Sequence, residues 1–361
     1  MSDSIKFQEP PAQVPQVPLL TIGIPTYNRA GFLKRCLDHI FDQVTPAMAP
    51  LVRILVGDNA SPDGTEGVVA EYCQRGIEVV YMRHAENLGA DGNFMKILET
   101  MGDTHYWMLL GDDDWIMPGG LARILDLLSS SSPLGAVFLE CRPRHEQFVS
   151  HGSTFLLDRE AFVKYVNHHL TFISCMIFPK EALRTARQGF EECRGSRIQQ
   201  LGWVFPQILR ADRFGVIGKM IIGAEVGNTG GYGFSTVFVT HFWRIWNRYF
   251  VDYPVLTHWV RTNMHLFFYQ NFLVEIRTGT GSDFKAEADC KKILEDEFAG
   301  EWSYTLYLKP VMCLWPPLAR VYFRVCGLVR LLKLWRQGEA LKRSLATGAV
   351  TRVVPDGPPK A

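Results

Sequence analysis

Between residues 19 and 140 the chain alternates short apolar runs with segments whose apolar residues recur at helical spacing. The apolar runs cover 19–25, 51–57, 77–82, 105–110 and 135–140. The intervening segments cover 30–43, 65–74, 91–101 and 118–129. The first of these places Phe32, Leu33, Cys36, Leu37, Ile40 and Phe41 at helical spacing. Strands that alternate with helices of this length form parallel sheets covered by helices. We therefore predict an α/β fold with a doubly wound, mainly parallel sheet.

After residue 140 the pattern is less regular. Residues 148–157, 171–178 and 214–226 read as strands, and 180–188 and 198–210 read as helices. A glycine-rich loop at 227–233 precedes an aromatic-rich segment, 234–277, which we expect to be helical. The pattern thus divides the chain into an α/β part over 19–226 and a helical C-terminal region over 227–346. The polar, proline-rich residues 1–18 and the tail 347–361 are expected to be disordered.

Composition narrows the class of protein. The 361 residues carry a net charge of +1, which argues against a nucleic-acid partner. The eight cysteines are scattered without a Cys-x-x-Cys pair, a pattern typical of reduced thiols rather than of a disulfide framework or zinc site. The N-terminus lacks a signal-peptide pattern, and no stretch reaches the ~18 uncharged apolar residues of a membrane-spanning helix. The expected location is cytoplasmic.

A run of three carboxylates follows the apolar segment 105–110. Asp112, Asp113 and Asp114 come at the carboxyl end of a predicted strand, where open α/β sheets place their ligands. Adjacent like charges repel unless a cation or solvent compensates them, and a hard divalent cation with oxygen ligands would do so. The alternative is a solvated acidic turn whose last Asp caps a helix that begins near Pro118.

Four segments in order resemble the family 2 glycosyltransferases. They are the opening strand Thr21–Arg29, the second-strand motif Val56–Thr65, the segment Asn87–Asn93 and the acidic run Asp112–Asp114. Each motif is short, but all four follow one another at the family's spacing over residues 19–140. The resemblance implies a GT-A fold. It makes 19–226 a nucleotide-sugar-binding and catalytic domain and 227–346 a region for the acceptor and a membrane interface.

The resemblance also implies which residues hold the nucleotide. Asp58 corresponds to the family's Asp that reads the base, although an Asp at a strand end is also a common turn residue. Just past the first strand, the segment with Pro25, Thr26, Tyr27 and Arg29 offers backbone, stacking and cationic contacts to a nucleoside diphosphate. Arg29 could equally be an N-terminal residue of a helix.

Asn87 and Asn93 flank small residues where a loop meets a helix, so backbone can approach a ligand closely there. Helix capping is the alternative for both. Asp112 completes the expected donor-binding set.

The metal motif departs from the family pattern. The family's Asp-x-Asp would begin at position 111, which is Gly111 here. Asp113 matches the second Asp, and Asp112 and Asp114 are its expected helpers in holding Mn²⁺ or Mg²⁺. Such a cation would neutralise charge on the departing diphosphate.

A base for the acceptor hydroxyl is harder to place. The family supplies a Glu-Asp pair about 90 residues past the metal motif. Here Gly189–Glu192 resembles the segment before that pair and Asp212–Ile217 the strand after it, yet 196–204 contains no carboxylate. Glu191, Glu192, Asp114 and His241 are the candidates, of which we favour Glu192 and Asp114 as catalytic residues together with Asp113. His241, in an aromatic helix, is more typical of a structural histidine.

The glycine-rich loop 227–233 has no phosphate-loop Lys and no Gly-x-Gly-x-x-Gly pattern, so it is interpreted as a flap or a connector. Its Asn-x-Gly-Gly-Tyr run, followed by an aromatic helix, resembles the abequosyltransferase-like branch, which adds dideoxy sugars during O-antigen synthesis.

Basic residues dominate 309–343, where Glu339 is the single acid. Arg330, Lys333 and Arg336 fall on one helical face with Leu and Trp beside them, a pattern typical of a helix in a membrane interface. The alternative is a helix packed on the core, with its basic side chains reaching out to water.

Together these features predict a metal-dependent glycosyltransferase, hexosyl or deoxyhexosyl, of bacterial surface polysaccharide synthesis. It would move sugar from a nucleoside-diphosphate donor to a lipid-linked or soluble glycan acceptor, bound peripherally to the inner face of the cytoplasmic membrane. The alternatives are a non-catalytic nucleotide-sugar-binding relative and a sugar-phosphate nucleotidyltransferase. The second lacks support because no glycine-rich phosphate loop follows the first strand. The nucleotide, the stereochemical outcome and the oligomeric state stay open.

Overall fold

The structure, a computed structural model, describes residues 17–130, 133–141, 153–225, 232–279, 287–346 and 350–353. The expected lead-in therefore lies outside the described residues up to residue 16. The same holds for residues 226–231, which include most of the glycine-rich loop, and for 347–349 and 354–361 of the tail.

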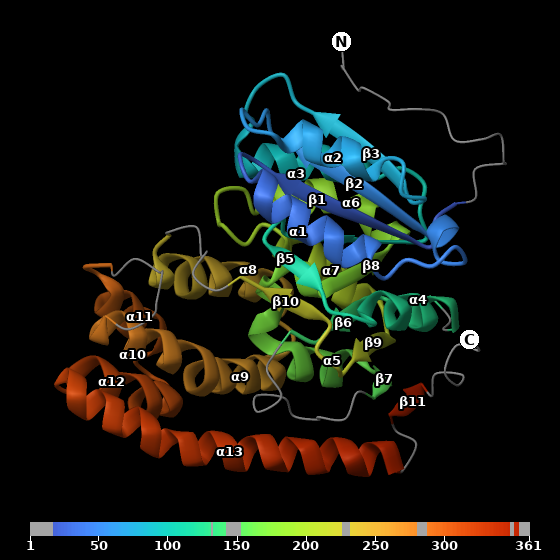
Figure 1. Cartoon of the computed structure of the whole chain (residues 1–361). Helices are drawn as coiled ribbons and strands as arrows, with labels where there is room; N and C mark the ends of the chain where they lie inside the picture. Colours follow the sequence, from blue (N-terminus) through green and yellow to red (C-terminus); the bar gives the residue numbers. More distant parts are fainter. Residues whose placement is uncertain are drawn as a thin grey trace.

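Four parallel strands form the N-terminal half of the central sheet (Figure 1). They are β1 (Leu20–Thr26), β2 (Val52–Asp58), β3 (Glu78–Arg83) and β4 (Tyr106–Leu109). β1 lies between β2 and β4, and β3 pairs with β2. The helices that connect these strands are α1 (Ala30–Phe41), α2 (Thr65–Tyr72) and α3 (Gly89–Thr100), and α4 (Gly120–Ser130) follows β4. The predicted alternation of strands and helices is confirmed.

The described strands complete a nine-stranded sheet of order β11-β7-β9-β6-β8-β4-β1-β2-β3. Its second half contains β6 (Val137–Leu139), β7 (Thr154–Leu157), β8 (Met176–Pro179), β9 (Phe214–Ile217) and β11 (Thr351–Val353). β8 runs antiparallel between β4 and β6, and β7 runs antiparallel to both of its neighbours. The other seven strands share one direction, so the sheet is mainly parallel, as predicted. β11 lies within the tail that was expected to be disordered, and this expectation is wrong for residues 351–353.

The acidic run begins a second, small sheet. β5 (Asp114–Ile116) pairs antiparallel with β10 (Ile222–Ala224), with Asp114 opposite Ala224. Asp114 is therefore a strand residue, and the alternative of a helix cap at this position is wrong. Because β10 follows β9 in the chain, this pairing ties the acidic run to the far half of the central sheet.

Three helices accompany the second half of the sheet, α5 (Arg159–Val166), α6 (Leu183–Glu192) and α7 (Leu201–Arg210). α6 and α7 touch through two glycines. A Cβ built on Gly189 would lie 1.9 Å from the carbonyl oxygen of Gly202, and the reverse distance is also 1.9 Å. Only glycine allows this approach, and it fixes where the N-terminus of α7 meets the sheet.

The C-terminal region is helical, as predicted. Its helices are α8 (Phe242–Tyr249), α9 (Pro254–Asn263), α10 (Gln270–Thr278), α11 (Cys290–Phe298), α12 (Lys309–Cys313) and α13 (Pro316–Ala346), with π-helical turns at Thr236–His241, Met264–Tyr269 and Tyr304–Leu308. One apolar cluster runs from the sheet into these helices. The rings of Phe205 and Trp246, from α7 and α8, lie 5.4 Å apart within it. The two regions therefore share a core.

Helix α13 lies along the outside of the molecule beside α9, α10 and α12 (Figure 1). The side chains of this helix are partly arranged in the opposite way to those of an ordinary surface helix, with basic groups facing the protein and apolar groups facing solvent. Arg330 faces the protein, where it donates to Gln270 Oε1 at 2.6 Å and lies 4.0 Å from the ring centroid of Phe323. Burial lowers the pKa of Lys333 on the same side. Much of the solvent-facing side is instead apolar, with Leu328 69% and Trp335 63% exposed.

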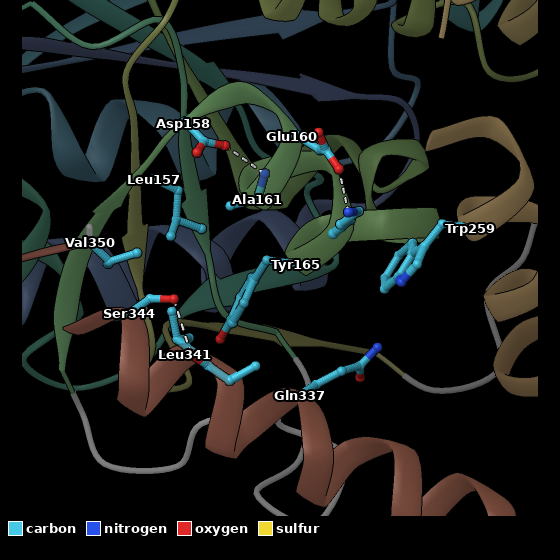
Figure 2. A pocket seen from close by; sticks show the side chains of 12 residues that line it. Leu157, Asp158, Glu160, Ala161, Tyr165, Trp259, Gln337, Leu341, Ser344 and Val350 are labelled. Carbon is cyan, nitrogen blue, oxygen red and sulfur yellow. Dashed lines mark hydrogen bonds and ion pairs between the residues drawn. The ribbon is translucent and has the colours of Figure 1, made fainter. Parts of the chain in front are cut away.

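The C-terminal end of α13 borders a cavity of about 450 Å³ against α5 and α9 (Figure 2). Two acidic groups at its rim have partners within the protein, whereas Gln337 Oε1 is buried without a hydrogen-bond partner among the described residues. Asp158 Oδ1 accepts from the backbone N–H of Ala161 at 2.8 Å and caps α5, and Glu160 pairs with Lys164. Gln337 and Leu341 of α13 complete the wall, so this cavity marks where the long helix meets the α/β part. In the part of the chain that the structure describes, no helix combines the length and apolar composition needed to cross a membrane.

Candidate nucleotide-sugar site

A cavity of about 610 Å³ lies over the carboxyl ends of β1 and β4. Most of the residues expected to bind a donor line it. They are Pro25, Thr26, Tyr27, Arg29, Asn87, Asn93, Asp112, Asp113 and Asp114. The wall is completed from the second half of the chain by residues before and within α7 and by the segment Thr171–Ile173. The sequence predicted that these side chains lie together, because parallel strands present their carboxyl ends at one edge of a sheet.

Two side chains from the end of β1 hold the first two carboxylates. The hydroxyl of Thr26 donates to Asp112 Oδ2 at 2.8 Å. One guanidinium nitrogen of Arg29 lies 3.2 Å from Asp112 Oδ1 and 3.3 Å from Asp113 Oδ2. Burial raises the pKa of Asp112 to about 6, against the lowering effect of Thr26 and Arg29. Arg29 therefore compensates part of the negative charge in the protein itself.

The third carboxylate, Asp114, is held by Ser174, which lies just before β8. Ser174 donates to Asp114 Oδ2 at 2.5 Å and accepts from the backbone N–H of Gly111 at 2.9 Å. Burial raises the pKa of Asp114 to about 7, and the neighbouring carboxylates add to the increase. The three carboxylates Asp112, Asp113 and Asp114 thus carry more negative charge than the surrounding protein groups compensate.

The space above Gly111 is where carboxylate oxygens converge. A Cβ built on Gly111 would lie 2.9 Å from Asp113 Oδ1 and 2.9 Å from Asp114 Oδ2. The missing first Asp of the family's motif therefore leaves a cradle with two carboxylate oxygens on its rim. Among the described residues no group of three or more His, Cys, Asp or Glu side chains is arranged to enclose a metal ion. The residues fit a Mg²⁺ or Mn²⁺ ion that takes one or two carboxylates and completes its shell with donor phosphates and water.

Two asparagines, Asn87 in the β3–α3 connection and Asn93 within α3, also line the cavity. Asn87 Oδ1 accepts from the side-chain amide of Asn59 and the backbone N–H of Gly89, both at 2.8 Å. Asn93 donates to the carbonyl of Gly57 at 2.8 Å. Both residues line the cavity, and both also hold α3 against β2. The two asparagines therefore support the fold and border the ligand cavity at the same time.

Asp58 does not line the cavity. Its side chain is 1% exposed, and its two oxygens accept from the N–H of Ser61 at 2.9 Å and the hydroxyl of Tyr81 at 2.6 Å. Arg83 lies 3.8 Å from the second oxygen. Its base-reading role stays a prediction, and contact with a base would require these bonds to rearrange.

Arg197 is a cavity residue that the sequence did not single out. It lies just before α7 and has φ = +66°, a conformation that costs a non-glycine residue energy. Strain of this kind is often retained where a side chain has to point at a ligand. With Arg29 it gives the cavity guanidinium groups from both halves of the chain. A lone Arg in an irregular segment carries no sequence signal that would have identified it.

The favoured base Glu192 lies away from the cavity. At the end of α6 it pairs with Arg248 at 2.8 Å and accepts from Gln188. Glu191 pairs with Arg194, and His241 Nδ1 contacts the carbonyl of Ser196 at 3.0 Å. None of the three lines the cavity.

The fold and this cavity define a GT-A type α/β protein. Residues 21–186 match the sequence profile of Glycosyl transferase family 2, so this segment is similar to the glycosyltransferases of that family. Over 180 residues it is 27% identical to the abequosyltransferase RfbV of Salmonella typhimurium, covering 45% of this chain and 53% of the relative. Over 132 residues it is 24% identical to an uncharacterized glycosyltransferase of Mycoplasma pneumoniae, the MG025 homolog, covering 36% and 43%. The chain thus spans about half the length of the curated relatives that it matches.

Solved structures share the fold over most of the chain. TarS of S. aureus, residues 1–349 in complex with UDP, superposes with a TM-score of 0.56 at 14% identity over 91% of both chains. A longer TarS structure gives a TM-score of 0.57 at 16% identity over 88% of this chain and 55% of that one. The predicted GT-A fold is confirmed, and the similarity to an abequosyltransferase agrees with the branch that the sequence indicated.

Proposed function

We propose that this protein transfers a sugar from a nucleoside-diphosphate donor to a lipid-linked or soluble glycan acceptor in bacterial surface polysaccharide synthesis. The observation that carries the proposal is the convergence of Asp112, Asp113 and Asp114 with Arg29 and Arg197 on one cavity of a family 2 domain. The volume of about 610 Å³ suits a nucleotide sugar. Relatives support the donor class, since one is an abequosyltransferase and TarS shares the fold in complex with UDP.

In this proposal Arg29 and Arg197 bind the donor diphosphate, because guanidinium groups match phosphate oxygens in a bidentate way. Asp113, assisted by Asp112 and Asp114, would hold Mg²⁺ or Mn²⁺ against the same phosphates. When bound, the ion supplies charge neutralisation for the leaving diphosphate. Tyr27 is 44% exposed at the cavity, and its ring is available to cover the nucleoside.

We also propose that α13 binds the protein peripherally to the cytoplasmic membrane surface, where a lipid-linked acceptor would be held. Its exposed apolar positions are Leu318, Val321, Val325, Leu328, Val329, Leu331, Leu332 and Trp335, with Trp315 just before the helix. Arg320, Arg324 and Arg336 are exposed on the same helix. An exposed apolar stripe flanked by cations suits an anionic lipid surface, where each basic residue contributes ~1 kcal/mol.

The test of the donor site is thermal stabilisation by UDP, CDP, GDP and TDP, each with and without Mn²⁺. We expect one nucleotide to raise the melting temperature of the wild type in a manner that depends on Mn²⁺. Asp113→Ala should lose the Mn²⁺-dependent part, whereas Asp126→Ala, at an exposed position of α4, should keep it. If no nucleotide stabilises the wild type, the donor site is refuted. If Asp113→Ala retains the full effect, the metal assignment is refuted.

A further inference from the structure

The N-terminus of α7 presents amides to the cavity in the place where the family carries its acidic pair. Gln199 and Gln200 both line the cavity and are 6% and 8% exposed. Gln200 donates to the carbonyl of Thr171 at 2.5 Å and is thereby fixed to the cavity wall. A neutral amide cannot accept a proton at neutral pH, so neither residue can deprotonate an acceptor hydroxyl.

A carboxylate reaches this place from another helix. Asp91, in the first turn of α3, accepts a hydrogen bond from Gln199 Nε2 at 2.6 Å. The two residues are 108 positions apart, and in the described part of the chain this is the only hydrogen bond of the Asp91 side chain. Asp91 is not itself a lining residue, but its α3 neighbours Ala90 and Asn93 and its partner Gln199 line the cavity, so Asp91 lies directly behind the cavity wall.

The hydrogen bond between Asp91 and Gln199 explains why position 199 carries an amide and not an acid. A carboxylate accepts only, so its partner has to donate, and the amide nitrogen of Gln199 does so. A Glu or Asp at 199 would instead bring a second negative charge against Asp91. An acid at one of these two positions therefore disfavours an acid at the other, and this chain carries it on α3.

Two sources of positive potential lie near Asp91. The N-terminus of a helix carries a partial positive charge in its first turn. The pKa of Arg194 is raised mainly by its hydrogen bond to Glu191, and the nearby charge of Asp91 adds to the increase. By contrast, Asp112 and Asp114 are occupied by Thr26, Arg29 and Ser174 at the proposed metal site.

Given the proposed glycosyl transfer, on which this step rests, we propose that Asp91, held by Gln199, is the base that deprotonates the acceptor. The acceptor oxygen forms a bond to the anomeric carbon of the donor sugar. The bond from that carbon to the diphosphate oxygen breaks, and its electron pair leaves with the diphosphate. The proton of the acceptor hydroxyl passes to a carboxylate oxygen of Asp91.

The test uses acceptors that do and do not carry a proton. Wild type is first incubated with UDP-glucose, UDP-N-acetylglucosamine, GDP-mannose and CDP-glucose to find one that it hydrolyses. With that donor, Asp91→Asn should hydrolyse at least 100-fold more slowly, since water has to lose a proton. Transfer to azide should stay within about threefold of wild type, because the azide anion needs no base. Glycosyl azide is quantified by mass spectrometry, and Asp126→Asn serves as the control for a lost surface carboxylate.

Stabilisation by the matching nucleotide separates a catalytic defect from a binding defect. We expect Asp91→Asn to keep the nucleotide-induced shift in melting temperature. Loss of that shift, loss of azide transfer together with hydrolysis, or unchanged hydrolysis would each overturn the role of Asp91. The role of Asp91 would also be overturned if Glu192→Gln, and not Asp91→Asn, hydrolysed the donor slowly while still transferring the sugar to azide. A wild type that neither binds a nucleotide nor hydrolyses a donor would instead refute the proposed function itself.

Discussion

Gly189 and Gly202 form a backbone-to-backbone contact in which neither residue has room for a side chain. A methyl group on either would lie 1.9 Å from the carbonyl oxygen of the other. Since the first turn of α7 and the cavity residues before it depend on this contact, packing far from the ligand controls the shape of the site.

We expect Gly202→Ala to lower the free energy of unfolding by about 3 kcal/mol, because α6 and α7 have to move apart to admit the methyl group. Urea denaturation measures the change. Gly67→Ala is the matched control, since Gly67 lies within α2 with nothing near its Cβ position. That variant should be neutral or more stable by up to about 1 kcal/mol. Equal effects of the two substitutions would contradict the role of the helix contact.

Arg197 should show opposite effects on stability and binding. Arg197→Gly removes the cost of φ = +66° and should raise the free energy of unfolding by about 1 kcal/mol. The same change removes a guanidinium from the cavity and should weaken binding of the stabilising nucleotide about 10- to 100-fold. Calorimetric titration measures the affinity, and Arg187→Ala, an exposed Arg on α6 paired with Glu99, controls for net charge. Unchanged affinity would remove Arg197 from the diphosphate site.

His265 should make the protein less stable in acid. It is fully buried, its Nδ1 lies 2.9 Å from Ser303 Oγ, and burial lowers its pKa to about 3. In the unfolded chain its pKa is about 6.5, so between pH 6.5 and 3 the unfolded state binds the extra proton. This residue's contribution is complete above pH 6.5 and declines as pH falls, by at most about 1.4 kcal/mol per pH unit.

The measurement is the difference in unfolding free energy between wild type and His265→Gln at pH 7 and pH 5. The comparison with the variant is needed because Asp112 and Asp114, whose pKa values are raised, have the opposite pH dependence. We expect the variant to lose less stability than wild type over this range. Parallel curves would show that His265 binds a proton equally in the folded and unfolded states, which would contradict its lowered pKa.

The apolar side of α13 should control binding to lipid. Leu328→Ser combined with Leu332→Ser should weaken binding to vesicles of phosphatidylglycerol and phosphatidylcholine at least tenfold, because two exposed leucines no longer enter the interface. Cosedimentation measures it, and Val255→Ser, an equally exposed apolar position on α9, is the control. Failure of the wild type to bind anionic vesicles would contradict the membrane proposal. So would a dimer in solution that the double substitution dissociates.

The sequence predicted the parts of the molecule that depend on local pattern. The apolar runs ending at Pro25 and Leu110 predicted the strands β1 and β4, and the carboxyl ends of these strands carry most of the expected cavity residues. Three features depend on distant segments and left no local signal. They are the antiparallel insertion of β8 between β4 and β6, the contact between Asp91 and Gln199, and the conformation of Arg197.

Helix α13 shows a different limit of pattern analysis. Its basic and apolar positions were recognised, but the side that faces the protein was not. Arg330 enters the protein because Gln270 and backbone carbonyls are there to accept its hydrogen bonds, and the leucines are consequently left outside. A single helix cannot show which of its faces has such partners, since these belong to α10 and its neighbours.

The last strand of the sheet also affects how the chain reaches its folded state. β11 pairs with β7, with Thr351 opposite Leu156, so β7 gains this partner only after the helical region between them has been synthesised. Until then β7 exposes unpaired backbone N–H and C=O groups, which can template pairing with another molecule. The four strands β1 to β4 need no such late partner. During translation the nucleotide-binding half can therefore form early, while β7 depends for its protection on a strand that follows the whole helical region.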